Sequence, residues 1–500
     1  MYLTASMLYD YIRCPHKVWR DRYGPQDEKN PETNPFVELL WERGLQHEKE
    51  TIKTLGEFLD LSAGGFEERF EKTKEAMRQK TPLIYEGVLI YGNLLGIPDL
   101  LRLQSDGNYV PIDIKSGMGF EGGDEEESAD GKPKPHYAVQ LCLYVETLIR
   151  LCFAKERKAI ILDINRNEAE YDLLKPRGVK TPQTWWEFYE EIKEQVWALL
   201  NDKTHNSPAA GSACKLCPWY SSCKKWCADR DDLTCVSGLG RSRRDTINAD
   251  LGIMTVNGIL NLDLPKIMAQ KRKDKKFLHG IAEKTIDSFM TRANVLRVTK
   301  KPVLHEAIDL PVVATELFFD IEDDPTQEFV YMHGVYERSA SGERYLSFIA
   351  SEVTPEAEER AWKEFWDYVR TLKKDDFAVY YYSHHEKTTY KRMQKKYPRL
   401  IEETAVGLFF ENPNVIDLYK IVRGKTDWPL WSYSLKDIAQ YLGFRWRDET
   451  PSGALSIQWY SEYLKTGDEK ILNRIKLYNE DDCKATMVLK DALARMAVGE

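Results

Sequence analysis

The sequence predicts an α/β protein with more than one domain. The chain has 500 residues, 42% of them hydrophobic, which is about three times the usual domain length with an ordinary content of core residues. Short apolar, β-rich segments occur at 86–103 and 108–116, and strands alternate with helical patterns from residue 316 to the C-terminus. One hydrophobic core cannot hold such a chain, so we expect two or three domains.

We expect three regions along the chain. Residues 1–230 mix helical patterns with a strand pair, and residues 301–500 form a second α/β domain. Residues 231–300 form a basic connecting module, because eleven Lys or Arg but only three acidic residues lie between Lys266 and Lys301.

Composition limits the function only weakly. The formal net charge is -9, so a surface that binds a polyanion has to be a local patch. The chain has no apolar run of the roughly 18 residues that a membrane span needs, and its first residues lack the pattern of a signal peptide. We therefore expect a cytoplasmic protein without a membrane partner.

Two carboxylates and an ammonium group mark the strand pair of the first region. Asp99 ends one β-rich segment in a Pro-Asp pair, and Asp113 precedes Lys115 by two residues at the end of the next. A hairpin brings the carboxylates together, where they can bind Mg²⁺ or Mn²⁺, while the lysine activates water or stabilises charge on a phosphate. Taken alone the pattern is weak, since surface strands often end in Asp and Lys.

Two further segments strengthen this interpretation. His47 lies in a helical segment as a possible metal ligand, although a lone helical histidine is more often solvated. Gln140 and Tyr144 are four residues apart on one helix face, where a structural role would bury the tyrosine.

The four elements in this order, Gly-x-x-His-Glu, Pro-Asp, Asp-x-Lys and Gln-x-x-x-Tyr, resemble the RecB-like branch of the PD-(D/E)XK nucleases. The resemblance implies a restriction-endonuclease-like fold in the first domain. It also implies that His47, Asp99 and Asp113 hold the metal, that Lys115 serves the water, and that Gln140 and Tyr144 support the substrate or the site geometry.

The nine cysteines are unevenly placed, with four of them between Cys214 and Cys227. In a reducing compartment such clustering favours metal ligands over disulfides. A local zinc site completed by Cys227 is one interpretation. The pattern also resembles the iron-sulfur staple of CRISPR-associated adaptation exonucleases and AddB-type nucleases. That resemblance implies a structural 4Fe-4S cluster that leaves Cys227 and Cys235 as spares, and its ligands would be Cys14, Cys214, Cys217 and Cys223.

The connector contains two Gly-Ile turns before short helices, at 249–267 and 278–296, which resemble helix-hairpin-helix elements. Such turns contact phosphates through backbone amides without reading sequence. Ala282 stands where the pattern prefers glycine, and a solvated charged linker is the alternative.

Acidic residues in separate segments of the last region form a second candidate site. Asp320 and Glu322 alternate on a strand, Glu386 begins a helix, and Tyr478 and Asp482 are four residues apart in the final helical segment. Carboxylates from separate segments can hold two divalent ions about 4 Å apart.

Together these motifs resemble the DEDD 3'-5' exonucleases of the ribonuclease H-like fold. The resemblance implies that Asp320, Glu322 and Asp482 are metal ligands and that Tyr478 orients the attacking water. The family usually has Asp where this chain has Glu386, which puts full two-metal competence in doubt. Asp417 could compensate, although a helix cap or strand end explains it equally well.

These resemblances cover nearly the whole chain and match fused RecB-like and ribonuclease H-like nucleases of the YprB type. We expect a metal-dependent nuclease with two sites that acts on single-stranded DNA ends, with RNA as the alternative substrate, in DNA repair, recombination or defence. A rival interpretation is a nucleic-acid-binding partner of a helicase in which the C-terminal domain is inactive. A CRISPR-type adaptation nuclease is another. The chain lacks a Gly-x-x-x-x-Gly-Lys-Ser/Thr loop, so any helicase would act in trans.

Overall fold

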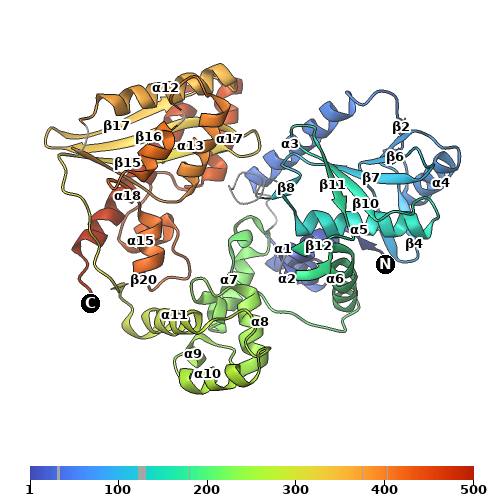
Figure 1. Ribbon diagram of the computed structural model, residues 1–500, viewed down its shortest axis with the longest axis horizontal. Helices are drawn as coiled ribbons and strands as arrows, with labels where there is room; N and C mark the ends of the chain where they lie inside the picture. The colour runs from blue at the N-terminus through green and yellow to red at the C-terminus, as the bar shows by residue number, and fades with distance from the viewer. Residues whose placement is uncertain (31–33, 122–130, 179–180, 374–375, 403, 500) are drawn as a thin grey trace. The chain divides into compact units, whose positions relative to one another are not determined.

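The computed structural model describes residues 1–30, 34–121, 131–178, 181–373, 376–402 and 404–499 (Figure 1). The chain divides into two compact units, which are described separately below. Unit 1 comprises Met1–Pro208 and Ser212–Ser222, and unit 2 comprises Ala209–Gly211 and Cys223–Glu500. Both units are mixed α/β structures, as the sequence predicts.

A six-stranded mixed sheet forms the centre of unit 1. Its strands, in spatial order, are β11 (Glu168–Asp172), β10 (Lys158–Leu162), β7 (Tyr109–Ile114), β6 (Leu100–Leu103), β3 (Leu83–Tyr85) and β2 (Leu59–Asp60). Strands β6 and β7 are antiparallel, with Leu100 opposite Ile112, whereas β7 and β10 are parallel. The predicted hairpin around Asp99 and Asp113 is therefore confirmed.

Helices and shorter strands complete unit 1. The helices are α1 (Ala5–Arg13), α2 (Pro15–Tyr23), α3 (Pro35–Ile52), α4 (Phe66–Arg78), α5 (Pro135–Arg150) and α6 (Trp185–Leu200). The remaining strands are β1 (Leu3–Thr4), β4 (Leu89–Tyr91), β5 (Leu94–Gly96), β8 (Phe120–Glu121), β9 (Lys132–Pro133), β12 (Pro176–Gly178) and β13 (Thr181–Thr184). Helix α5 lies against the sheet and buries every residue from Ala138 to Leu148 except Gln140, so it forms much of the unit's core.

Unit 2 begins with a small helical part that has its own apolar cluster. Its helices are α7 (Tyr220–Asp229, whose first turn belongs to unit 1), α8 (Gly240–Leu251), α9 (Val256–Ile259), α10 (Leu264–Lys273) and α11 (Glu283–Asn294). Helix α8 ends at Gly252 in the left-handed conformation, and α11 follows a turn in which Gly280 also has positive φ. The connector is therefore a folded helical element rather than an extended linker.

A five-stranded sheet forms the rest of unit 2 with helices on both of its faces. The strand order is β17 (Gly342–Ile349), β16 (Phe329–Ser339), β15 (Thr315–Asp324), β18 (Phe377–Tyr381) and β19 (Val415–Asp417). The first three strands are antiparallel, and β15, β18 and β19 are parallel. The strands and helices predicted to alternate from residue 316 onward are thus present. A further short pair joins β14 (Val303–Leu304) to β20 (Thr426–Asp427).

The alternation along β15 sends its side chains to two different layers. Leu317, Phe319 and Ile321 pack on one face with residues of α12 and α13, whereas Phe318 packs on the other face with residues of α18. The helices of this sheet are α12 (Pro355–Thr371), α13 (His385–Lys396), α14 (Ala405–Glu411), α15 (Leu418–Lys425), α16 (Leu435–Tyr441), α17 (Gly453–Thr466) and α18 (Glu469–Arg495). Along the described chain, no helix combines the length and the apolar character needed to cross a membrane.

One buried carboxylate ties three of these elements together. Glu358 of α12 is 0% exposed and accepts hydrogen bonds from the backbone N–H of Val330 in β16 (2.6 Å), from Lys396 Nζ at the end of α13 (2.6 Å) and from the hydroxyl of Tyr397. A buried carboxylate with this many donors is well compensated for the loss of water.

We predict that Glu358→Leu lowers the free energy of unfolding by at least about 2 kcal/mol, because it leaves a buried backbone donor and a hydroxyl without their acceptor. Chemical denaturation of both proteins measures the change. Glu356→Ala, an exposed substitution on the same helix, is the control and should stay within about 0.5 kcal/mol of the parent. Equal effects of the two substitutions would contradict the prediction.

Candidate active sites

The strand pair of unit 1 brings together the first set of predicted residues. Asp99 precedes β6, and Asp113 lies in β7 beside the residue that pairs with Leu100. The backbone N–H of Ile114 donates to Asp99 Oδ2 (2.6 Å), and Lys115 Nζ lies 2.9 Å from Asp113 Oδ2. The two carboxylates and the ammonium group therefore share one end of the hairpin.

Burial and charge both act on these three groups. Burial raises the pKa of Asp99 well above its usual range, the nearby carboxylate of Asp113 raises it further, and Lys115 opposes the shift. Burial alone would lower the pKa of Lys115, but Asp113 and Asp99 hold it above its usual value. Neighbouring carboxylates of this kind form a favourable site for a divalent cation, because hard cations prefer oxygen ligands.

Helix α3 carries the predicted His47 and, next to it, Glu48, which lies near this end of the hairpin. His47, a predicted ligand, has a buried Nε2 atom that makes no hydrogen bond. Glu48 was not among the predicted residues, yet burial raises its pKa, and both Lys115 and Asp113 act on it electrostatically. The hydroxyl of Tyr85 donates to Glu48 Oε1 (2.9 Å). The signal for Glu48 was available, since it stands next to His47 in the motif.

Helix α5 contacts the segment before Asp99 through Tyr144, which Gln140 supports. Gln140 Nε2 donates to the Tyr144 hydroxyl (3.0 Å), which in turn contacts the carbonyl of Ile97 (3.4 Å). Gly96 allows this approach, since a Cβ there would lie 2.5 Å from Tyr144 Cδ1. Tyr144 thus supports the backbone that leads to Asp99, while Gln140 Oε1 is buried without a hydrogen-bond partner.

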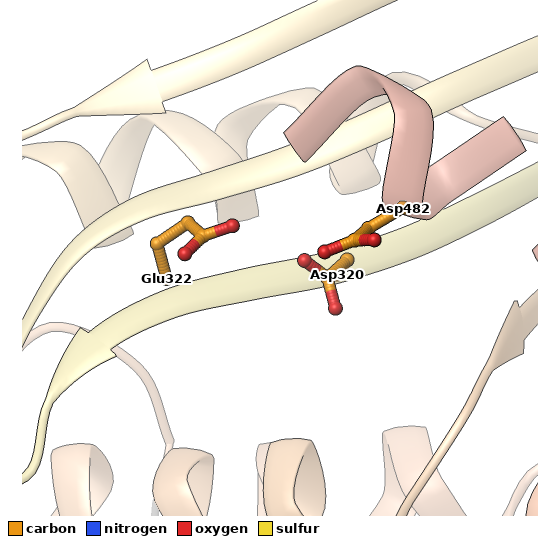
Figure 2. Close-up of side chains that lie close together, drawn as sticks. All are labelled: Asp320, Glu322 and Asp482. Carbon is orange, nitrogen blue, oxygen red and sulfur yellow. The ribbon is translucent and has the colours of Figure 1, made fainter. Parts of the chain in front are cut away.

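In unit 2 the strand β15 and the helix α18 bring three carboxylates together. Asp320 and Glu322 lie on the β15 face that is opposite to α12, and Asp482 reaches them from α18 (Figure 2). Ligand oxygens of the three residues lie within 4.8 Å of one another. Within the described parts of the chain this is the only such group of three or more His, Cys, Asp or Glu residues, so His47, Asp99 and Asp113 are not drawn as closely together. The donor set, all carboxylate oxygens, fits Mg²⁺ or Mn²⁺.

Asn479 of α18 holds two of these carboxylates in place. Its Nδ2 donates to Asp320 Oδ2 (2.8 Å) and contacts Glu322 Oε1 (3.2 Å), while its Oδ1 accepts from the hydroxyl of Tyr345 (2.8 Å). Gly334 pairs with Asp320 in the sheet and makes room for the amide, because a Cβ there would lie 1.6 Å from Asn479 Oδ1. The sequence analysis missed Asn479, although its position one helical turn before Asp482 places it on the same face.

Three other side chains surround Asp482. Trp446 Nε1 donates to Asp482 Oδ1 (2.7 Å), and Lys436 Nζ donates to the hydroxyl of Tyr478 (2.7 Å). Tyr478 is buried, and its hydroxyl also hydrogen-bonds Asp482. The hydroxyl predicted to orient water therefore already serves as a link between Lys436 and the carboxylate. Neither Trp446 nor Lys436 stands out in the sequence, because both come from the segment between β20 and α17.

Burial and neighbouring negative charges both act on the carboxylates of this group. Burial raises the pKa of Asp320 well above its usual range, and the charges of Asp482 and Glu322 raise it further. The pKa of Glu322 is raised to about 8, because burial and the charge of Asp482 outweigh the lowering effect of the Asn479 hydrogen bond. A divalent cation bound here would offset the repulsion among these carboxylates.

Glu386 lies outside this closest group. It begins α13 as predicted, and its charge acts on Asp320 only after those of Asp482 and Glu322. Burial raises its pKa to about 8, and its Oε2 makes no hydrogen bond. Asp417 ends β19 and accepts from the backbone N–H of Tyr419 (2.9 Å), so it caps α15. The cap uses only Oδ1, and Asp417 Oδ2 is buried without a hydrogen-bond partner.

The cysteines of the predicted cluster and the two predicted spares lie in different places. Cys14 and Cys214 both act on the thiol of Cys217, whose pKa is raised first by burial, so these three thiols of unit 1 lie near one another. Cys223 follows in α7. Cys227 and Cys235 are buried in the apolar cluster of the helical part, and burial raises their pKa values to about 11 and about 12. Among described residues no cysteine belongs to a close ligand group, and the four-iron cluster stays a prediction.

Comparison with protein families matches both halves of the chain. Residues 9–224 match the model of the PD-(D/E)XK nuclease superfamily, and residues 317–494 match a model of the RNase H superfamily. No curated protein and no solved structure gives a significant match. The first match contains Asp99, Asp113 and Lys115, and the second contains the three clustered carboxylates. The chain therefore joins a PD-(D/E)XK nuclease superfamily domain to an RNase H superfamily domain and is a metal-dependent nuclease.

Proposed function

We propose that both domains hydrolyse phosphodiester bonds and that the protein degrades single-stranded ends of DNA, with RNA as the alternative substrate. The observation that carries the proposal is the convergence of Asp320, Glu322 and Asp482, in a domain joined to a second one with its own paired carboxylates. A domain retained only for binding would have no physical reason to keep two buried carboxylates and a half-buried one so close together.

In the first site the roles follow from position. Asp99 and Asp113 would hold a divalent ion, which when bound lowers the pKa of water and stabilises charge on the phosphate. Lys115 lies beside Asp113, where it neutralises negative charge and can donate a hydrogen bond to a phosphate oxygen. Gln140 presents an unpartnered Oε1 atom, and Tyr144 keeps the Asp99 loop in place.

In the second site Asp320, Glu322 and Asp482 would be the metal ligands. Asn479 aims the first two, since one amide donates to both carboxylates. Lys436 offsets the negative charge of all three, as its lowering effect on their pKa values shows. Glu386 would act on this group through its charge, or move closer to it when substrate and cations are bound.

The helical part of unit 2 is proposed to grip the nucleic acid backbone without reading its sequence. Arg272 and Lys273 at the end of α10 and Lys275 and Lys276 beyond it are exposed, which gives a local positive patch on an acidic chain.

A four-iron cluster on Cys14, Cys214, Cys217 and Cys223 is proposed as a structural element. The approach of three of these thiols from residues about 200 positions apart supports it, and so does the burial of Cys227 and Cys235 in a separate apolar cluster. Such a cluster would close a long loop and so stabilise the first domain.

We predict that the two sites act independently. Asp113→Ala should remove one activity and Asp320→Ala another, each by at least about 100-fold, because each substitution removes a metal ligand worth several kcal/mol. The measurement is degradation of end-labelled single- and double-stranded DNA and RNA with Mg²⁺, Mn²⁺ or EDTA, using strands blocked at either end.

The exposed Asp106→Ala, in the turn of the same hairpin as Asp113, is the matched control and should leave both activities unchanged. If Asp113→Ala alone eliminates every product, the C-terminal domain is a binding platform, as in the helicase-partner interpretation. If neither substitution lowers degradation, the proposed function is wrong.

We predict that the anaerobically purified protein contains iron and is brown, and that Cys14→Ser removes the colour and lowers the melting temperature of the first domain. Cys235→Ala is the control, because this thiol is buried in the other cluster. Metal analysis and visible absorbance measure the result. One zinc per chain that survives Cys14→Ser would show instead that the cysteines form a local zinc site.

We predict that the metal-free protein becomes less stable as the pH rises. The pKa of Glu322 is about 8 in the folded state against 4.5 ordinarily, so between these values the folded chain binds more protons than the unfolded chain. The free energy of unfolding therefore falls with increasing pH, and Mn²⁺ should offset the loss most strongly above about pH 8.

Thermal unfolding of the C-terminal domain in EDTA and in Mn²⁺ provides the measurement. Glu322→Gln cannot titrate, so its melting temperature in EDTA should depend less steeply on pH than that of the parent. A slope identical to the parent's would show that Glu322 is not the group responsible.

A further inference from the structure

Aromatic and basic side chains gather beside Lys115 in unit 1. Tyr9 comes from α1, and His136 and Tyr137 come from the first turn of α5. Arg13 and Lys134 accompany them from the end of α1 and from the residue before α5. We refer to these five residues as the aromatic-basic shelf.

The three rings of the shelf contact one another. The Tyr9 ring lies 4.8 Å from that of His136 in an edge-to-face arrangement and 6.4 Å from that of Tyr137, to which it is nearly parallel. His136 and Tyr137 are 4.5 Å apart. All three side chains are only partly buried, so ring surface remains accessible to solvent.

Cations border the rings on more than one side. Lys115 Nζ lies 5.6 Å from the centre of the Tyr137 ring, Lys134 Nζ lies 5.2 Å from it, and the Arg13 guanidinium lies 5.9 Å from the centre of Tyr9. Burial and, after it, the positive charges of Arg13, Lys134 and Lys115 together lower the pKa of His136 to about 4. His136 is therefore a neutral ring at physiological pH, within a locally positive environment.

A purely structural role explains only part of this arrangement. Packing of Tyr137 under Lys115 would steady the lysine, but neither Tyr9 nor Arg13 contacts Lys115 in that way. Accessible rings bordered by cations are the combination that binds single-stranded nucleic acid, since bases stack on the rings while phosphates meet the positive charges.

We propose that the aromatic-basic shelf binds unpaired bases of a nucleic acid strand next to the phosphate cleaved at the Asp99–Asp113 site. The inference rests on the proposed function and names its substrate class more closely. Bases in a duplex are already stacked and paired, so only a single strand offers its faces to the shelf. The first site should accordingly prefer single-stranded over blunt double-stranded ends.

Photocrosslinking tests the contact without requiring cleavage. A single strand that contains iodouracil is irradiated with the full-length protein in EDTA, and the adducts are located by mass spectrometry. We expect adducts on Tyr9 and on the peptide with His136 and Tyr137, and loss of the Tyr9 adduct in competition with unlabelled single strand but not with duplex. Adducts found only elsewhere in the chain would overturn the proposal.

Affinity measurements with variants give a second test. In EDTA, Tyr9→Leu should weaken binding of a labelled single strand by at least about fivefold, the effect of losing one base-ring stack, whereas Tyr9→Phe should retain it. Tyr91→Leu is the matched control, because Tyr91 is an exposed tyrosine beside Arg150 at the opposite end of α5. Equal weakening by Tyr9→Leu and Tyr91→Leu would overturn the proposal.

The proposed function can fail separately. If the shelf is crosslinked but Asp113→Ala retains full activity, the shelf stands and the catalytic assignment is wrong. If cleavage depends on Asp113 but Tyr9 neither crosslinks nor affects affinity, the shelf proposal is wrong and the nuclease assignment stands.

Discussion

The placement of buried carboxylates next to one another is the constraint on which both domains depend. In unit 1 the charge of Asp113 raises the pKa of Asp99, and in unit 2 the charge of Asp482 raises the pKa values of Asp320 and Glu322. Carboxylates removed from water are stable only when donors or cations face them, and close like charges add to that requirement. The residues around each cluster supply these hydrogen-bond donors and positive charges.

The donors and positive charges come from different places in the two domains. In unit 1 the compensation is local, because a backbone N–H and an ammonium group come from the strand that carries Asp113. In unit 2 it comes from distant segments, with an amide from α18, an indole and an ammonium group from the segment before α17. The second site thus forms only when the whole domain is folded, whereas a single hairpin provides most of the first.

Burial also separates these cysteines into two environments. Cys227 and Cys235 lie within the apolar cluster of the helical part, where a thiol behaves as a small hydrophobic group and its ionisation is suppressed. Cys14, Cys214 and Cys217 are less buried and lie near one another. The distinction concerns environment and not spacing, because all four cysteines between 214 and 227 are close in the sequence.

The sequence by itself determined the features that local patterns encode. The alternation through β15 placed Asp320 and Glu322 on one face, and the Asp-x-Lys spacing put Asp113 beside Lys115, since side-chain direction repeats every two residues along a strand. Only the tertiary structure decided which groups support them. Asn479 donates to Asp320, which is 159 positions away in the sequence, and needs the space left by Gly334. Glu48 approaches the first site from helix α3. Glu386 lies outside the closest group of carboxylates. Such contacts depend on how helices and strands pack against one another. Packing brings together residues that are far apart in the sequence, so local sequence patterns do not predict these contacts.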